Sequence, residues 1–247
     1  MTEKYDLEKI KNSVICGDAL TELKKLPDAC VDMILCDLPY GTTACAWDTI
    51  IPFEPLWEQY KRIIKDNGAI VLTASQPFTS ALVMSNIKMF KYEIIWEKEQ
   101  ATNFMMLKKQ IGKSHENILL FYSNQPTFNP QKVKTKKPVK SVGGNKIETY
   151  GGFSAKGSDE IRNKKYPCSI LRVKRDKGFH PTQKPVALGQ YLIRTYTNEG
   201  DLMLDNTCGS GSFLVAAKQL YRNFIGIEIS PEYCKIANQR LAQKTLF

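Results

Sequence analysis

The chain alternates short apolar segments with amphipathic ones, and this alternation constrains its fold more than any other feature. Residues 202–205 and 224–229 are apolar runs that favour buried strands, and the segments that follow them, 211–221 and 231–243, have helical spacing. The same spacing predicts strands at 13–16, 32–36, 69–73, 92–96 and 118–122, and helices at 19–26, 53–65, 77–89 and 185–197. Strands that alternate with helices of this length predict an α/β fold with a doubly wound, mostly parallel sheet.

Residues 124–179 interrupt this alternation, because Lys, Gly, Pro and Asn replace the periodic apolar positions there. The segment is too long for an ordinary connection between secondary-structure elements. We therefore expect a functional subdomain or a long loop inserted between two halves of one domain, residues 1–123 and 180–247.

The excess positive charge of the chain is concentrated around this insertion. Residues 97–180 hold 18 Lys and Arg against 7 Asp and Glu, whereas the rest of the chain holds 17 against 18, so the net charge of +10 arises in this one segment. Such a distribution predicts a surface that faces a polyanion, although a solvated face is the alternative. Five lysines within nine residues are the candidates for phosphate contacts: Lys132, Lys134, Lys136, Lys137 and Lys140.

A first candidate site lies where the expected strand 32–36 ends. Asp37, Leu38, Pro39 and Tyr40 follow it, and the carboxyl edge of an open α/β sheet is where ligands bind. Pro39 restricts its own backbone and that of Leu38, which fixes a carboxylate, a carbonyl and an aromatic ring together. The set suits a flat base with an exocyclic amino group: Asp37 and the Leu38 carbonyl accept its N–H groups, and Tyr40 stacks on the ring. A strand followed by a proline turn and a packed tyrosine is the structural alternative.

A second candidate site lies in the last third of the chain. Asp205 ends one expected strand, a turn with Gly209 and Gly211 opens the next helix, and Glu228 ends the following strand. Glycines let a ligand approach the backbone closely, and an acidic residue at that strand end is placed to bind ribose hydroxyls. Leu214 occupies the position of the third glycine in a dinucleotide fingerprint, which favours another nucleoside cofactor over NAD.

Composition narrows the class of protein further. The seven cysteines are scattered without a C-x-x-C pair, several within apolar runs, which predicts buried free thiols in a reducing compartment. The first residues are polar and charged, so we expect no signal peptide, and no apolar run is long enough to span a bilayer. With two isolated histidines, His115 and His180, we expect no metal site, and we expect a cytoplasmic protein.

Six segments, taken together and in order, resemble S-adenosylmethionine-dependent DNA amino-methyltransferases. They are CGDAL at 16–20, DLPYG at 37–41, SHENILLF at 114–121, HPTQKP at 180–185, LDNTCGSGS at 204–212 and FIGIEISPEY at 224–233. The catalytic motif precedes the glycine turn and the basic insertion lies between them, an order that resembles the circularly permuted β group. The resemblance covers about residues 12–123 and 180–243 and leaves the insertion unmatched.

The resemblance implies a role for each matching residue, with double-stranded DNA as partner and the target base flipped out of the helix. Asp37, the Leu38 carbonyl and Tyr40 would hold the base, with Pro39 setting their geometry, while the insertion would recognise the DNA target. The remaining roles concern S-adenosylmethionine: Asp18 at its adenine amino group, Asp205, Gly209 and Gly211 at its methionine end, Glu228 at its ribose, Thr182 and Lys184 at its carboxylate, and Ala19 and Ser212 as further cofactor-binding residues. Both histidines would be structural.

Two departures from the family pattern stand out. Leu38 replaces the first proline of D-P-P-Y, an exchange we expect to be tolerated because a backbone carbonyl is required there. Asn206 and Thr207 replace the proline and phenylalanine that follow the cofactor aspartate, so the fit around the methionine part is less well defined. Because Asp opens the tetrapeptide, adenine N6 is favoured over cytosine N4. An RNA or protein-amide methyltransferase and a non-catalytic nucleic-acid-binding module are alternatives, and the recognition sequence, a restriction partner and a homodimer are left open.

Overall fold

A computed structural model describes residues 3–42, 48–141, 158–176 and 183–243 of the chain. It contains two compact units, one formed by Met1–Asn129 with Ser169–Phe247 and the other by Pro130–Cys168. The first unit carries an eight-stranded sheet, and the second carries a two-stranded sheet. The two units are described separately below.

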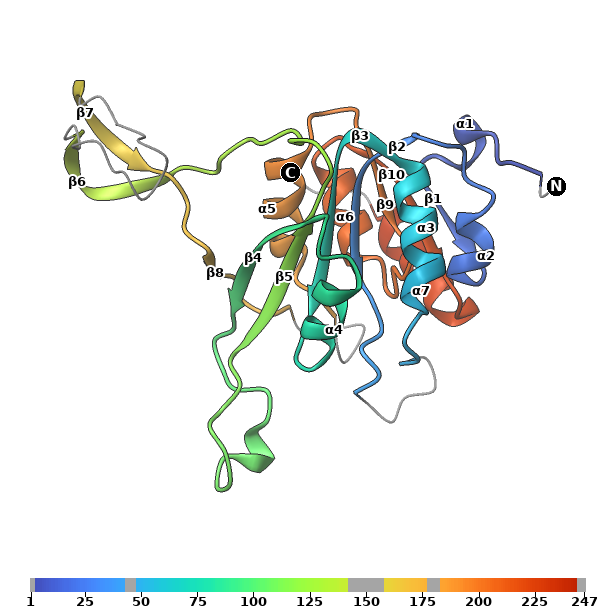
Figure 1. Ribbon diagram of the computed structural model, residues 1–247, viewed down its shortest axis with the longest axis horizontal. Coiled ribbons are helices and arrows are strands. Elements are labelled where there is room, and N and C mark those ends of the chain that lie inside the picture. Colours follow the sequence, from blue (N-terminus) through green and yellow to red (C-terminus); the bar gives the residue numbers. More distant parts are fainter. Residues whose placement is uncertain (1–2, 43–47, 142–157, 177–182, 244–247) are drawn as a thin grey trace. The chain divides into compact units, whose positions relative to one another are not determined.

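The large sheet of the first unit is doubly wound (Figure 1). In spatial order its strands are β1 (Ser13–Cys16), β10 (Asn223–Glu228), β9 (Leu202–Asp205), β2 (Val31–Asp37), β3 (Ile64–Ala74), β5 (His115–Phe121), β4 (Phe90–Glu97) and β8 (Ile170–Arg172). Every neighbouring pair is parallel except the two that involve β5, which runs against β3 and β4. The predicted doubly wound, mostly parallel α/β fold is confirmed.

The strand order reverses between β9 and β2. From β9 the chain winds outward through β10, whereas from β2 it winds the other way through β3. Parallel neighbours bring the carboxyl ends of β9 and β2 to the same edge, so Asp205 and Asp37 end adjacent strands there. A crevice at such a reversal is where open α/β sheets bind their ligands.

Helices cover both faces of this sheet. The helices of the first unit are α1 (Leu7–Ile10), α2 (Ala19–Leu23), α3 (Phe53–Ile63), α4 (Phe78–Ser85), α5 (Val186–Tyr196), α6 (Ser212–Gln219) and α7 (Pro231–Ala242). Residues of α2, α3 and α4 belong to one buried apolar cluster, and residues of α5, α6 and α7 belong to a second one. The strand side chains alternate between the two, as the period of a β-strand requires. Ile34 and Cys36 join the first cluster, and Met33 and Leu35 join the second.

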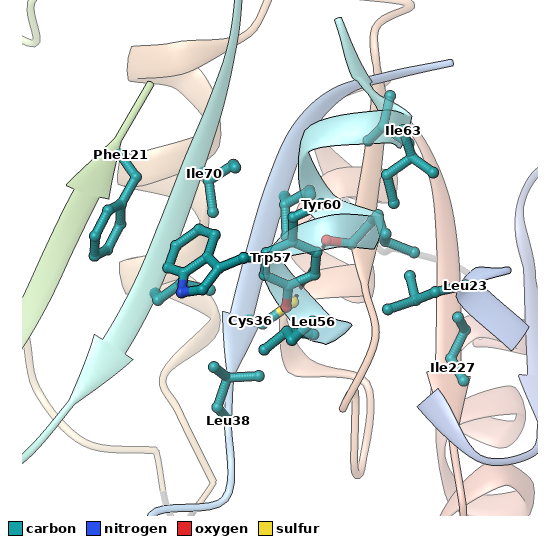
Figure 2. Close-up of a cluster of buried hydrophobic side chains, with 14 of the residues drawn as sticks. Leu23, Cys36, Leu38, Leu56, Trp57, Tyr60, Ile63, Ile70, Phe121 and Ile227 are labelled. Carbon is teal, nitrogen blue, oxygen red and sulfur yellow. Dashed lines mark hydrogen bonds between the residues drawn. The ribbon is translucent and has the colours of Figure 1, made fainter. Parts of the chain in front are cut away.

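Helix α3 shows how the first cluster forms. Leu56, Trp57, Tyr60 and Ile63 lie three or four residues apart, so they share one face of the helix, and all are buried. Figure 2 shows this face against the strands, with Trp57 toward Phe121 and the Tyr60 hydroxyl next to the sulfur of Cys36. The rings of Trp57 and Phe121 lie 4.9 Å apart. This packing fixes α3 over β2, close to the strand end that carries Asp37.

Two sequence-based expectations about secondary structure were wrong. The helix expected at 53–65 ends at Ile63, and β3 begins at Ile64 and continues through Asn67 and Gly68, where a break was expected. The Asn67-Gly68 pair lies where the register of β3 against β2 shifts: Ile64 faces Val31 and Ala69 faces Met33, so the irregularity falls within the strand and does not end it. Part of the segment expected to lack regular structure also forms strands, because β8 pairs with β4 at the edge of the large sheet.

The second unit is a β-hairpin. Its strands β6 (Val133–Ser141) and β7 (Ser158–Lys165) are antiparallel, and Lys134 lies opposite Lys164. The side chains of Lys132, Lys134, Lys136 and Lys137 are exposed, and the ammonium of Lys132 lies 4.8 Å from the ring centroid of Tyr166. The side chain of Lys140 lies outside the described residues. The predicted insertion, 124–179, is longer than this unit at both ends.

Candidate functional site

The first unit contains a pocket of about 960 Å³ at the point where the strand order reverses. This volume suits a nucleoside-sized ligand together with a second flat group. The pocket brings together most of the predicted site residues: Asp18, Ala19, Asp37, Leu38, Pro39, Tyr40, Lys184, Asp205, Gly209, Ser212 and Glu228. The two candidate sites therefore form a single cavity. Thr182 and His180 lie outside the described residues, and His115 is exposed at the start of β5.

The carboxylate of Asp37 is held by three side chains. Its Oδ1 accepts hydrogen bonds from the Tyr40 hydroxyl at 2.7 Å and from the Thr73 hydroxyl, and its Oδ2 faces the Lys184 ammonium at 2.6 Å. Burial, with the negative charges of Asp37 and Glu116, holds the pKa of Tyr40 well above its ordinary value, so this hydroxyl stays a donor. The orientation of Asp37 is therefore fixed before any ligand binds.

The ring of Tyr40 is also fixed in place. One contact is with Phe78, at the start of α4, whose ring is stacked at a centroid distance of 5.2 Å. The other is with the ammonium of Lys184, which lies 5.5 Å from the centroid of the Tyr40 ring. Lys184 thus contacts both groups that were predicted to hold the target base, Asp37 and Tyr40.

Lys184 belongs to a buried chain of alternating charges. Its side chain is 6% exposed, and its ammonium contacts Asp37 and, at 3.2 Å, Glu116 Oε2. Glu116 also pairs with Lys98, so the ion pairs run in space from Asp37 through Lys184 and Glu116 to Lys98. Burial alone would lower the pKa of Lys184, but the two carboxylates raise it above its ordinary value. Burial alone would raise the pKa of Glu116, but Lys184 and Lys98 lower it.

The glycine turn after β9 is shaped by two positive φ angles. Gly209 has φ +50° and a Cβ added there would meet no atom within 4 Å, which leaves the backbone open on that side. Gly211, at φ +77°, precedes α6, and an added Cβ would lie 3.0 Å from the Ala237 side chain. Gly209 is therefore placed for close approach of a ligand, whereas Gly211 is required for the packing of α6 against α7.

Acidic groups surround this turn. Glu228 Oε2 accepts a hydrogen bond from the Gly209 amide at 2.8 Å, and Oε1 accepts one from the Ser230 amide at 2.9 Å. Burial raises the pKa of Asp205 well above its ordinary value, and the charges of Asp37 and Glu228 act in the same direction. On the next strand end, Asp18 Oδ1 caps α2 by accepting from the Thr21 amide at 2.9 Å. Asp18, two residues beyond the end of β1, and Glu228, the last residue of the neighbouring strand β10, both line the pocket.

Asn206 and Thr207 connect the glycine turn to β2. The Oδ1 of Asn206 accepts hydrogen bonds from the Tyr60 hydroxyl at 2.6 Å and from the Cys36 thiol at 2.9 Å. The Thr207 hydroxyl donates to the backbone carbonyl of Asp37 at 3.1 Å. These two residues replace the family's proline and phenylalanine, and they hold the turn by hydrogen bonds that those residues are unable to form.

Sequence reasoning missed several of these residues. Glu116 and Lys98 sit in or beside apolar strands, and a charged residue in such a run is a signal that it has a buried partner. Thr73 ends a strand that neighbours β2, a position that only the register reveals. Thr207 was noted as a departure from the family pattern, but its bond to Asp37 follows from the strand order and from no local motif.

The comparison with known families decides the classification. A family model of the N6/N4 methyltransferase kind, described as a DNA methylase, matches residues 31–239. The chain belongs to this family. The matched range includes both halves of the pocket, from Asp37 on β2 to Glu228 on β10.

Among curated relatives, this DNA methylase is 30% identical over 246 residues to the type II methyltransferase M.HpaI of Haemophilus parainfluenzae, covering 92% of this chain and 73% of the relative. It is 29% identical over 249 residues to the DNA adenine methyltransferase YhdJ of Escherichia coli K12, covering 93% of this chain and 82% of YhdJ. These alignments span most of each chain, and they include the insertion as well as the sheet.

Among solved structures, the methylase is similar to the complex of M1.HpyAVI with S-adenosylmethionine. The TM-score is 0.63 at 26% identity, and the match covers 92% of this chain and 98% of the other. The fold is also shared with the cytosine-N4-specific PvuII DNA methyltransferase, with a TM-score of 0.67 at 14% identity over 95% and 88% of the two chains.

Four buried cysteines, Cys30, Cys36, Cys208 and Cys234, are free thiols. Within the part of the chain that the structure describes, no three His, Cys, Asp or Glu residues gather as they would around a metal ion. Over the same residues, none of the helices combines the length and apolar character needed to cross a membrane.

Proposed function

We propose that the protein transfers a methyl group from S-adenosylmethionine to the N6 atom of adenine in double-stranded DNA. The observation that carries this proposal is the single pocket in which the Asp37–Tyr40 motif and the Gly209–Glu228 turn meet. Membership of the DNA methylase family and the likeness to YhdJ, named as a DNA adenine methyltransferase, support it. Cytosine N4 is the second candidate, but the cytosine-specific relative is 14% identical and supports the fold alone.

The pocket fits S-adenosylmethionine by the chemistry of its wall. The open backbone at Gly209 leaves room for close approach, and the carboxylates of Glu228 and Asp18 are acceptors for ribose hydroxyls and an adenine amino group. The solved complex of M1.HpyAVI, at 26% identity, contains this cofactor. When bound, S-adenosylmethionine supplies an electrophilic methyl group. In this assignment Asp205 and Ser212 line its methionine end.

The residues of the chain would prepare the target amine for attack. An exocyclic amine is a poor nucleophile, because its lone pair is delocalised into the ring. Asp37 and the Leu38 carbonyl would accept its two N–H bonds, which favours a tetrahedral nitrogen and frees the lone pair. Tyr40 would stack on the base, and the proton released after transfer would pass to Asp37 or to water. Fixing the amine in place supplies much of the rate enhancement.

Two roles are proposed for Lys184: binding the cofactor carboxylate and positioning Asp37. The family resemblance implies that it binds the cofactor carboxylate, and that role stays a prediction. In the structure its ammonium lies on Asp37 and Glu116, which makes it a positioning residue for Asp37. A variant that loses transfer rate with unchanged cofactor affinity would identify the positioning role, and a variant that loses affinity would identify the cofactor role.

The β-hairpin of the second unit is the proposed DNA-recognition element. Its strands place Lys134 directly opposite Lys164, and like charges at opposed positions destabilise a hairpin. A phosphate between such side chains removes that repulsion, which supports a polyanionic partner. The expected cytoplasmic location stays a prediction.

Modified-base sequencing of DNA from cells that express the protein tests the proposed function. We expect N6-methyladenine at one short sequence motif, and no modification in cells that express Asp37→Ala. N4-methylcytosine in its place would favour the second candidate. Unmodified DNA together with methylated RNA would contradict the choice of substrate.

A further inference from the structure

The loop that joins β4 to β5, residues 98–114, leaves the sheet at the edge that carries the pocket. Strand β4 runs parallel to β3, because both are antiparallel to β5, so the carboxyl ends of β2, β3 and β4 lie at one edge. Figure 1 shows this loop in green, projecting beyond the ends of those strands. Three residues at its root, Lys98, Thr102 and Lys113, line the pocket. The loop therefore extends outward from the wall of the candidate active site.

The outer part of the loop, residues 103–112, is an ordered turn, which we call the apolar tip. The side chain of Asn103 closes it: Oδ1 accepts from the Lys113 amide at 2.7 Å, and Nδ2 donates to the Ile111 carbonyl at 3.2 Å. The Thr102 amide donates to the Lys113 carbonyl at 2.9 Å just below it. The 3-10 helix η1 (Phe104–Met106) lies inside this closure.

The apolar tip exposes large hydrophobic side chains. Phe104 is 70% exposed, Met105 is 83% exposed and Ile111 is 94% exposed, and Met106 and Leu107 are exposed as well. Single exposed hydrophobic residues are ordinary, but a contiguous group of five on one turn marks an interaction surface. Because hydrogen bonds hold the turn itself, these side chains are presented to a partner and do not fold back onto the core.

The charges beside the tip indicate the chemistry of that partner. Lys108 and Lys109 lie within the tip and are exposed, whereas at the root of the loop Lys98 pairs with Glu116 and Lys113 donates to Ser75. A surface that combines exposed Phe, Met, Leu and Ile with lysines matches proteins that insert an apolar wedge between stacked bases while cations contact phosphates.

We propose that the apolar tip inserts into duplex DNA beside the target adenine and fills the space that this base leaves when it enters the pocket. The inference rests on the proposed function for its substrate, duplex DNA. Extruding a base costs unstacking and unpairing energy, and an apolar side chain in the vacated stack offsets part of that cost. Phe104 and Met105, adjacent on η1, are the wedge, and Lys108 and Lys109 contact the backbone beside it.

The test compares Phe104→Ala/Met105→Ala with the wild type on two duplexes that carry the methylated motif. In one duplex the target adenine is paired with thymine, and in the other it lies opposite an abasic site, so it is already unpaired. On the paired duplex we expect the single-turnover rate to fall about tenfold or more, since the variant bears the cost of base extrusion alone. On the abasic duplex we expect a rate within about twofold of the wild type.

Ile87→Ala is the matched control. Ile87 is 55% exposed and precedes the amino end of β4, at the opposite edge of the sheet from the pocket. It should leave both rates unchanged. An equal loss on the two duplexes in the double variant, or no loss on either, would overturn the wedge. A change of oligomeric state in sedimentation would also overturn it, because the tip would then be an interface between copies of the chain.

Permanganate oxidation of unstacked thymines separates this inference from the proposed function, because it detects base opening without methyl transfer. A wild type that opens the duplex without methylating it would contradict the proposed function. If the double variant also lost that opening, the wedge would stand. A double variant that opened the duplex as the wild type does would refute the wedge, whether or not methyl transfer occurs.

Discussion

Replacing Lys184 with methionine removes the central cation of the buried ion-pair network and keeps an unbranched side chain one atom shorter. Asp37 and Glu116 would then face each other without the ammonium that lies 2.6 Å from one and 3.2 Å from the other. Removing one partner of a buried ion pair typically costs about 3–5 kcal/mol, because it leaves a buried charge uncompensated. We expect about 3 kcal/mol, since Asp37 keeps two hydroxyl donors and Glu116 keeps Lys98.

The loss should depend on pH in a defined direction. The pKa of Glu116 is lowered in the fold, so its pairing stabilises the protein above the ordinary glutamate pKa and is lost as pH falls through the lowered value. The pKa of Lys184 is raised, so its contribution is present below the ordinary lysine pKa and is lost as pH rises through the raised value. The difference between wild type and Lys184→Met should be largest between about pH 5 and 10 and shrink near pH 4.

Urea unfolding at pH 7.5 and pH 4 measures this difference. With a slope of about 3 kcal/mol per M, a loss of about 3 kcal/mol lowers the midpoint by about 1 M at pH 7.5. Lys65→Met is the matched control, because Lys65 pairs with Asp32 at 2.7 Å but is 41% exposed, and it should cost less than about 1 kcal/mol. A Lys184→Met midpoint equal to that of the control, or a loss that is the same at both pH values, would refute a stabilising buried network.

Three further predictions follow from the site and the hairpin. Asp37→Ala should abolish methyl transfer while calorimetry still detects cofactor binding, and Glu228→Ala should weaken cofactor binding first; normal binding by Glu228→Ala would contradict the ribose assignment. Thr207→Val should lower the transfer rate about fivefold with little change in cofactor affinity, because it removes one hydrogen bond, worth about 1 kcal/mol, to the backbone that positions Asp37. Lys134→Ala/Lys136→Ala should flatten the slope of log K for DNA against log salt by about 2, since both side chains are exposed on the hairpin, and an unchanged slope would exclude them as phosphate contacts.

The doubly wound sheet was predictable because its strands are buried on both faces and read as short apolar runs. The expected strands at 13–16 and 202–205 coincide with β1 and β9. The Asn67-Gly68 pair misled, because its local preference is accommodated by an irregularity in the pairing of β3 with β2, and the strand continues beyond it. Strand β8 was missed for a related reason: three residues have no visible period, and its partner β4 is more than seventy positions away in the chain.

The site was predictable as far as local motifs reach. Asp37, Gly209 and Glu228 each end or follow an apolar run, so their place at one sheet edge follows from strand order alone. The ion pair between Lys184 and Asp37 is not predictable from strand order or from a local motif. In the sequence, Lys184 follows a loop and is expected to be solvated, and only the folded sheet places it next to Asp37. Charge pairs between distant elements are a property of the assembled sheet, and no spacing in the sequence encodes them.

Asn206 and Thr207 form hydrogen bonds across the strand reversal. Asn206 accepts from Tyr60 on α3 and from Cys36 on β2, which fixes the first residue of the glycine turn to the opposite half of the sheet. Thr207 then donates to the Asp37 carbonyl. A proline and a phenylalanine would position this turn by packing, whereas here directional bonds tie the cofactor side of the pocket to the base side. A displacement of this turn would therefore have to move the Asp37 backbone or break one of these bonds, so the geometry of the Gly209 side of the pocket is linked to that of the Asp37 side.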